Sequence, residues 1–224
     1  LKCRRWDLMA ATTLEQALSC LDGSAEVDVS YQGIADEGVG KLAEALKTNQ
    51  TVVDIYLDDN KITDAGVRPV ADLLGSSSTL RQVSFYHNLV TDIGVRALSK
   101  ALVRCSLSVL DLRENRVSDT GAAALAEALE AGSQLRFLLL KDNDITDEGA
   151  QRLATAVRAC GKDGPLQQLD LEANRITSKG SSYLKEVKEA LKKEIQFGYQ
   201  KSKAREQHQG VIDSHTQDGV FASR

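Results

Sequence analysis

The chain has 224 residues, which is enough for one ordinary domain, or two small ones, with a sizeable buried core. Its formal net charge of −4 argues against nucleic acid as a partner, because binding to phosphates relies on basic side chains. Aromatic residues make up 4% of the chain, so we expect many small packing sites of Leu, Ala and Val rather than one aromatic core.

The cysteines and the apolar runs narrow the class further. No C-x-x-C pair occurs, and no histidine stands at metal-ligand spacing from any of the four cysteines, which are Cys3, Cys20, Cys105 and Cys160. We therefore expect free thiols in a reducing compartment and an intracellular, cytoplasmic protein. No apolar run approaches the roughly 18 residues of a membrane span. No signal peptide is recognisable, and because the sequence begins with Leu1 it stays open whether upstream residues are missing.

The first predicted element is a helix over residues 12–22, with Thr12 or Thr13 as its N-cap. Its apolar stripe consists of Leu14, Ala17, Leu18 and Leu21. These leucines are in register with helices further along the chain. We interpret the segment as a capping half-repeat; the alternative is the remnant of a repeat from a longer chain.

An internal repeat dominates the rest of the sequence. A glycine follows a Thr-Asp or Ser-Asp pair, or a close variant, at spacings of 28, 28, 27, 28 and 31 residues: Gly38, Gly66, Gly94, Gly121, Gly149 and Gly180. Six residues before each glycine stands an amide side chain: Gln32, Asn60, Asn88, Asn115, Asn143 and Asn174. The longer last step contains an insertion at 161–165, whose Gly and Pro content is typical of a loop.

Each copy contains a strand pattern that reads L-x-x-L-x-L-x-x-N-x-I. In the fourth copy its positions are Leu107, Leu110, Leu112, Asn115 and Val117. Alternating apolar residues predict a strand with one buried face. The Asn amide can bond backbone groups left unpaired where the strand bends away, so we expect neighbouring Asn side chains to form a ladder.

After each glycine the apolar residues follow helical spacing. In the first copy they are Val39, Leu42, Ala43 and Leu46, which form one stripe of an amphipathic helix. We place Pro69 in the first turn of its helix, where a missing N–H costs little. Each unit is thus a strand, a bend and a helix. One unit cannot bury its own apolar face, whereas stacked units bury a continuous core.

The last copy departs from this pattern. Lys185 and Lys188 stand where an earlier copy has Ala126 and Leu129, and a polar face is what a terminal repeat needs, so we expect the array to end here. The remaining residues, 198–224, form a polar tail that we expect to be disordered on its own. The basic excess over residues 185–205 would suit an acidic partner or the acidic surface of this chain itself.

The strand motif, the Asn and the full helix of each unit resemble the ribonuclease-inhibitor-like class of leucine-rich repeats over about residues 24–197. The resemblance implies an α/β solenoid, a curved horseshoe with a parallel β-sheet on the concave side and α-helices on the convex side. Residues 1–23 would then be the N-terminal capping helix or half-repeat, and residues 24–197 six repeats of which the last is the C-terminal cap.

A second resemblance follows the last helix, where residues 194–200 read E-I-Q-F-G-Y-Q. This stretch is similar to the end of the repeat domain in the tropomodulin and leiomodin family, in which a Phe-Gly-Tyr run also follows the final helix. What usually comes next in that family is not reproduced at residues 201–207. The resemblance implies actin binding at the pointed end. A structural alternative is that Phe197 and Tyr199 close the open end of the core.

The outward positions of the predicted strands give the candidate interaction surface on the concave side. The candidate partner-binding residues are Asp54, Tyr56, Asp58, Tyr86, His87, Asp111, Arg113, Phe137, Leu139, Lys141, Asp170 and Glu172. Together with Glu26, Asp28, Asp59, Glu114 and Asp142, these positions carry ten acidic and two basic side chains. Such a surface favours a basic partner, and the aromatic residues are candidate anchors.

No catalytic, cofactor or metal site is predicted. The histidines, His87, His208 and His215, belong to no recognisable nucleophile or metal motif, and the glycines form no phosphate-binding loop. We therefore interpret the chain as a non-catalytic protein-interaction module or scaffold, a candidate subunit of a large multi-subunit complex, that binds through its concave face and tail. The alternatives are a cytoskeletal, actin pointed-end regulator, a GTPase-activating repeat protein, or the repeat domain of a truncated regulatory or innate-immune sensor protein.

Overall fold

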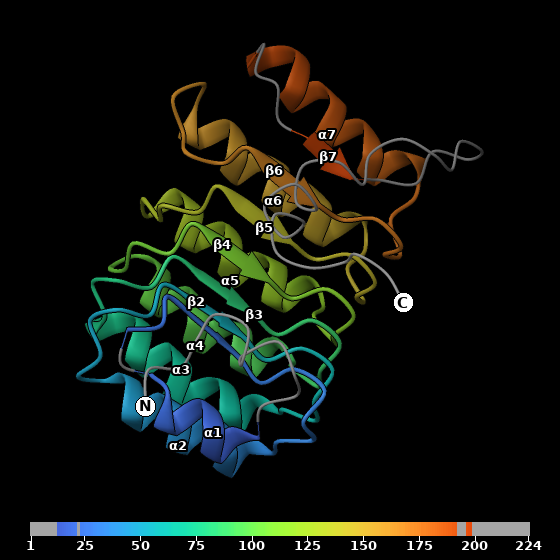
Figure 1. Ribbon diagram of the computed structural model, residues 1–224. Helices are drawn as coiled ribbons and strands as arrows, with labels where there is room; N and C mark the ends of the chain where they lie inside the picture. Colours follow the sequence, from blue (N-terminus) through green and yellow to red (C-terminus); the bar gives the residue numbers. More distant parts are fainter. Residues whose placement is uncertain (1–12, 22, 192–195, 199–224) are drawn as a thin grey trace, which may run out of the picture.

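Strands and helices alternate along the whole of the described chain (Figure 1). The computed structural model describes residues 13–21, 23–191 and 196–198. The strands are β1 (Glu26–Asp28), β2 (Asp54–Tyr56), β3 (Gln82–Ser84), β4 (Val109–Asp111), β5 (Phe137–Leu139), β6 (Gln168–Asp170) and β7 (Gln196–Gly198). The helices are α1 (Leu14–Ser19), α2 (Asp36–Leu46), α3 (Asp64–Ser76), α4 (Asp92–Leu102), α5 (Asp119–Glu130), α6 (Asp147–Cys160) and α7 (Ser178–Leu191).

All these strands belong to one open, parallel sheet whose spatial order follows the chain from β1 to β7. The pairing register repeats at every step: Val27 pairs with Ile55, and Ile55 pairs with Val83. The middle residues of β1 to β6 are at most 2% exposed, because they face the layer of helices that Figure 1 shows on one side of the sheet. The predicted α/β solenoid is therefore confirmed.

The core is built from the inward strand residues and one stripe of each helix. In α5 the buried stripe includes Ala122, Leu125, Ala126 and Leu129, as the helical spacing predicts. These side chains belong to a single hydrophobic cluster that runs from α1 to α7. Each repeat therefore buries the apolar face of its neighbour.

The predicted Asn ladder is present. The Asn115 side chain donates to the carbonyl oxygens of Phe85 (2.8 Å) and Leu112 (3.2 Å) and accepts from the main-chain N–H of Val90 (2.9 Å). Equivalent bonds are made by Asn60, Asn88, Asn143 and Asn174. Each Asn thus joins its own turn to the turn of the preceding repeat.

A second ladder, which we did not predict, joins the starts of the helices. Asp64 accepts through Oδ1 from the main-chain N–H groups of Thr91 (2.8 Å) and Gly94 (2.9 Å), and through Oδ2 from Thr91 Oγ1 (2.6 Å). The corresponding pairs are Asp36–Thr63, Asp92–Ser118, Asp119–Thr146 and Asp147–Thr177. A Cβ at Gly94 would lie 2.6 Å from Asp64 Oδ1, which explains the recurring glycine.

The helices begin earlier than predicted. Thr63 caps α3 by accepting from Ala65 N, so α3 starts at Asp64, two residues before Gly66. Pro69 is therefore the sixth residue of α3, and the prediction that it lies in the first turn was wrong. Its ring replaces an N–H that would otherwise donate to the carbonyl of Ala65.

The two ends of the described array also differ from expectation. Helix α1 is shorter than predicted, although Thr13 does cap it in a capping box with Gln16. Strand β7 was not predicted, and it pairs with β6 so that Phe197 stands at the register position of Leu169. The expected tail beyond residue 198 lies outside the described residues.

The cysteines fulfil the expectation of free thiols only in part. Cys105 is buried and free, and the half-buried Cys160 keeps a thiol that donates to the carbonyl of Leu129. Cys20 is disulfide-bonded, so the expectation was wrong for this residue. Cys3 lies outside the described residues.

Candidate protein-interaction surface

The candidate surface is the face of the sheet that points away from the helices, here called the concave face. One row of outward side chains is formed by the last residues of the strands, which are Asp28, Tyr56, Ser84, Asp111, Leu139 and Asp170. The first residues of the strands, among them Asp54 and Phe137, face the same way. A second row lies two residues further on: Ser30, Asp58, Tyr86, Arg113, Lys141 and Glu172. Members of one row are about 4.8 Å apart, the spacing of neighbouring strands, so they act as one surface.

A rim of left-handed residues borders the second row. The residue before Gln32 and before each ladder Asn has a positive φ: Tyr31 (59°), Asp59 (51°), His87 (51°), Glu114 (52°), Asp142 (54°) and Ala173 (54°). None of them is a glycine, so each costs about 1 kcal/mol or more of backbone strain. Tyr31 is 74% exposed on this rim.

Hydrogen bonds fix the side chains at the centre of the concave face. The Asp58 carboxylate accepts from the Ser84 hydroxyl and from the main-chain N–H of Tyr86 (3.2 Å), both on Oδ1. The Tyr86 hydroxyl donates to Glu114 (2.8 Å). Tyr86 is therefore held at both its backbone and its hydroxyl, which leaves its ring as a preorganised contact surface.

The neighbouring cation is also fixed. Arg113 donates to Asp111 through Nε (2.9 Å) and Nη2 (2.6 Å). Its guanidinium lies 5.1 Å from the centroid of the Tyr86 ring, a cation–π arrangement. Asp111 is buried beneath these contacts. The basic charge of Arg113 is therefore neutralised within the concave face.

On the rim, Asp59 binds two ring-bearing side chains. His87 Nδ1 forms a hydrogen bond with the Asp59 carboxylate, and this bond is the main reason why the pKa of His87 is raised. A hydrogen bond to the same carboxylate, followed by burial, raises the pKa of Tyr31. Tyr31, Asp59 and His87 come from three successive repeats, so the rim carries one continuous polar cluster.

Several carboxylates on the concave face are partly buried, which disfavours their charged form. Burial, followed by the charge of Glu26, raises the pKa of Asp54 to about 6. Burial raises the pKa of Asp58 to about 7, although the bonds from Ser84 and Tyr86 oppose this. Burial also raises the pKa of Asp170. Raised carboxylate pKa values cost stability at neutral pH, and groups of this kind are enriched at functional sites.

The second half of the concave face, over β4 to β6, has a different character. Phe137 is half-buried beside Arg136, whose guanidinium lies 5.8 Å from the ring centroid. Leu139 is only 1% exposed, so a partner cannot reach it directly without a rearrangement. Lys141 forms a salt bridge with Glu172 (3.3 Å). The candidate residues here are mostly paired or covered.

All twelve candidate residues lie on the outward strand positions or the rim, but the structure groups them differently from the sequence. Asp58, Tyr86, Arg113 and Asp111 form one network, whereas Phe137 and Lys141 belong to the second half. Tyr31 and Ser84 were not among the candidates. The repeat register could have identified Tyr31, because it occupies the position of Asp59 and His87.

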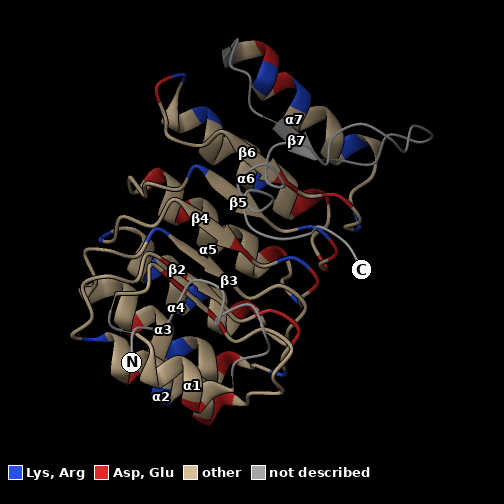
Figure 2. Ribbon diagram, in the orientation of Figure 1, with Lys and Arg blue, Asp and Glu red and all other residues tan. Residues whose placement is uncertain are grey.

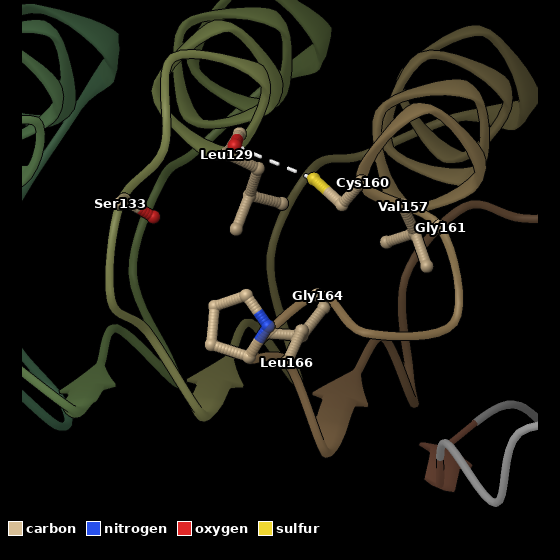
Figure 3. Close-up of a pocket in the computed structure, with 8 residues that line it drawn as sticks. Leu129, Ser133, Val157, Cys160, Gly161, Gly164 and Leu166 are labelled. Carbon is tan, nitrogen blue, oxygen red and sulfur yellow. Dashed lines mark hydrogen bonds between the residues drawn. The ribbon is translucent and has the colours of Figure 1, made fainter.

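A small pocket lies elsewhere, between the last turns of α5 and α6 and the insertion loop. Figure 3 shows Ser133 and Cys160 on opposite sides of it, among Leu129, Val157 and Leu166. The Cys160 thiol donates to the Leu129 carbonyl (3.4 Å), and the buried Ser133 hydroxyl has no hydrogen-bond partner among the described residues.

In the described part of the chain, no group of three or more His, Cys, Asp or Glu side chains is arranged to hold a metal ion. Within the same ranges, none of the helices has the length and apolar character needed to cross a bilayer.

The family comparison agrees with the repeat structure. The family model described as Leucine Rich repeat matches residues 48–71, 104–126 and 134–154. The chain therefore contains leucine-rich repeats in these three segments. A search of curated proteins by sequence gives no match.

Two solved structures show what this fold is similar to. One is leiomodin-1 actin-binding site 2, with 20% identity and a TM-score of 0.54, covering 65% of this chain and 86% of that chain. The other is the tropomodulin C-terminal domain from Caenorhabditis elegans, with 18% identity and a TM-score of 0.57, covering 66% of this chain and 93% of that chain. At these identities the likeness demonstrates the shared fold.

Proposed function

We propose that this chain is a non-catalytic protein-interaction module that binds a protein with a basic surface on its concave face. The observation that carries the proposal is the charge of that face: carboxylates crowd the outward positions of β1 and β2 and their turns, and Figure 2 shows acidic residues there. Uncompensated like charges reduce stability in the free protein, so their presence is best explained by a partner that neutralises them.

The aromatic residues add to this proposal. Tyr86 is held rigidly between Glu114 and Arg113, and Tyr31 is mostly exposed on the rim. Tyr side chains lose little conformational entropy on binding and are enriched at interaction hot spots. Acidic groups would supply steering and specificity, while these rings would supply contact area.

A module without catalytic groups suits a scaffold or a subunit of a larger complex. The expected intracellular, cytoplasmic location would bring such a module to cytoskeletal or regulatory partners.

The test is affinity capture with two matched variants of the whole chain. The concave variant carries Glu26→Gln, Asp54→Asn, Asp59→Asn and Glu172→Gln, and the convex variant carries Glu44→Gln, Asp72→Asn, Glu127→Gln and Glu148→Gln. Both remove four negative charges. A partner captured from the native lysate, identified by mass spectrometry and rebuilt with purified components, should bind the convex variant normally and the concave variant at least tenfold more weakly. Equal binding by both variants would contradict the proposal.

A second candidate function is the regulation of actin filaments. It is supported by the likeness to leiomodin-1 actin-binding site 2 and by the E-I-Q-F-G-Y-Q sequence after α7. We expect, on this alternative, that the chain slows the loss of subunits from filament pointed ends when barbed ends are capped. Unchanged depolymerisation at saturating chain concentration would exclude it and leave the basic-partner proposal standing.

A further inference from the structure

Charge is unevenly distributed over the concave face. In the half over β4 to β6, Arg113 is paired with Asp111 and Lys141 with Glu172. The other half consists of residues 26–31 and 54–60 and is here called the acidic half. It contains five carboxylates and no Lys or Arg: Glu26, Asp28, Asp54, Asp58 and Asp59.

Two of these carboxylates have spare capacity for a cation. Neither Asp54 nor Asp58 forms a salt bridge with any residue in the described ranges. Both hydrogen bonds to Asp58 end on Oδ1, so Oδ2 accepts none from a described residue. Asp54 and Asp58 are nevertheless partly buried, which makes their charges costly unless a cation or a proton compensates them.

The surroundings of both carboxylates are acidic or neutral, with a single exception. Asp58 is faced by Asp28 and Ser30 from the first repeat, by Ser84 and Tyr86 from the third, and by Asp111 and Arg113 from the fourth. Only Arg113 among them is a cation, and Asp111 already holds it. Asp54 is faced by the charge of Glu26 on β1 and pairs with Gln82 on β3.

A Lys or Arg side chain suits these carboxylates better than a metal ion does. A bound metal ion is a poor fit, because the described carboxylates are not arranged in any group of three that could hold one. A Lys or Arg side chain carries its charge on a long stem and can reach a recessed carboxylate from above the sheet. The Tyr56 and Tyr86 rings on the same face add surfaces suited to a cation or its stem.

We propose that the acidic half of the concave face docks a Lys- or Arg-bearing segment of the partner, and that cationic side chains take the place of the protons on Asp54 and Asp58. This inference rests on the proposed function and specifies both the docking half and its regulation by pH. The binding free energy then depends on how fully the two carboxylates have lost their protons before the cation arrives.

The effect of pH on binding can be calculated from the pKa values of Asp58 and Asp54. With pKa values of about 7 for Asp58 and about 6 for Asp54, ionisation between pH 6 and pH 8 should strengthen binding about tenfold and about twofold, respectively. The combined increase is about 20-fold. The bond to Asp59 raises the pKa of His87, and loss of the His87 proton would also strengthen the binding of a cation, so a variant must separate the contributions.

The probe is a fluorescent peptide in which Arg alternates with Ser, compared with a peptide in which Gln replaces Arg. Anisotropy titrations use the full chain at about 0.15 M salt, where exposed charges more than about 8 Å apart are screened. We expect the Arg peptide to bind about 20-fold more tightly at pH 8 than at pH 6, and the Gln peptide to bind at neither pH. The Asp54→Asn/Asp58→Asn variant should bind weakly at pH 8 with at most a small pH effect, whereas Asp72→Asn on the exposed face of α3 should behave like the native chain.

The outcomes separate the inference from the function on which it rests. Tight binding that is equal at pH 6 and pH 8, or an unchanged pH effect in the Asp54→Asn/Asp58→Asn variant, would overturn the proton exchange and leave the basic partner in place. Equal loss in the Asp72→Asn control would mean unspecific charge attraction and would also overturn it. No binding of the Arg peptide at pH 8 would overturn both proposals. Thermal unfolding curves of each variant verify that it is folded.

Discussion

Replacing Gly94 by Ala should destabilise the fold, even though Ala is the better helix former. The new Cβ would lie 2.6 Å from Asp64 Oδ1 and 3.1 Å from Cγ1 of Val90, so the Asp64 carboxylate must withdraw from the start of α4. It would then lose its bonds from Thr91 N, Thr91 Oγ1 and Gly94 N. Hydrogen bonds to charged groups contribute about 1.5–3 kcal/mol each, but water replaces part of this at a half-buried site.

We therefore expect Gly94→Ala to lower the free energy of unfolding by about 2 kcal/mol after a helix-propensity gain of about 1 kcal/mol. Asp64→Ala removes the same bonds and should cost about 2–3 kcal/mol. The double variant loses them only once, so its cost should be close to that of Asp64→Ala alone, with a coupling of about 2 kcal/mol.

Urea denaturation of the four proteins measures this cycle. Gly40→Ala in α2 is the matched control, because a Cβ there meets no atom within 4 Å, and it should raise stability by about 0.5–1 kcal/mol. If the two single effects simply add in the double variant, or if Gly94→Ala behaves like Gly40→Ala, the account of the helix-start ladder is wrong.

Further predictions concern stability. Asn115→Ala should cost about 3 kcal/mol in urea denaturation because buried backbone groups lose their partners, and Asn174→Ala, where water has access, should cost roughly half as much. The raised pKa of Asp58 means that its protonated form favours the folded state, so its contribution to stability falls as the pH rises from about 4 to about 7. Asp58→Asn should therefore stabilise the chain by about 1–3 kcal/mol at pH 8 and hardly at pH 4. Equal effects at both pH values would contradict this. Ala173→Gly should raise the melting temperature by a few degrees because it relieves a left-handed backbone, and a decrease would count against strain there. Pro69→Ala should raise the unfolding free energy by about 1–2 kcal/mol by restoring a bond within α3, with no gain as the contrary result.

The repeat was predictable because each of its marked residues has a single structural role. Leu110 can only face the core in a strand of this spacing, and Asn115 satisfies backbone groups that any such turn exposes. The helix-start ladder was missed because Asp64 and Thr91 meet only after two repeats are stacked. The recurring Thr-Asp-x-Gly spacing is visible in the sequence, but the hydrogen bonds that explain it form between neighbouring repeats.

The candidate surface was predictable in position but not in detail. Alternation along the strands identifies Asp58 and Leu139 as outward residues, as the structure has them. It does not show that Leu139 is covered or that Asp58 is removed from water, because both depend on side chains from neighbouring repeats. Strand β7 was missed because its sequence, Gln196–Gly198, has neither the leucines nor the Asn of the motif.

The central claim, that a basic segment docks on the acidic half, is tested most directly by site-specific photo-crosslinking. A benzoyl-phenylalanine at Tyr31, which is 74% exposed beside Asp59, should crosslink to the Arg-Ser peptide at pH 8. The same group at Val103, which is 42% exposed after α4, serves as the control and should not react with the peptide. Crosslinking at Tyr31 alone is the predicted result. Equal crosslinking at both positions, or crosslinking only at Val103, would contradict the account.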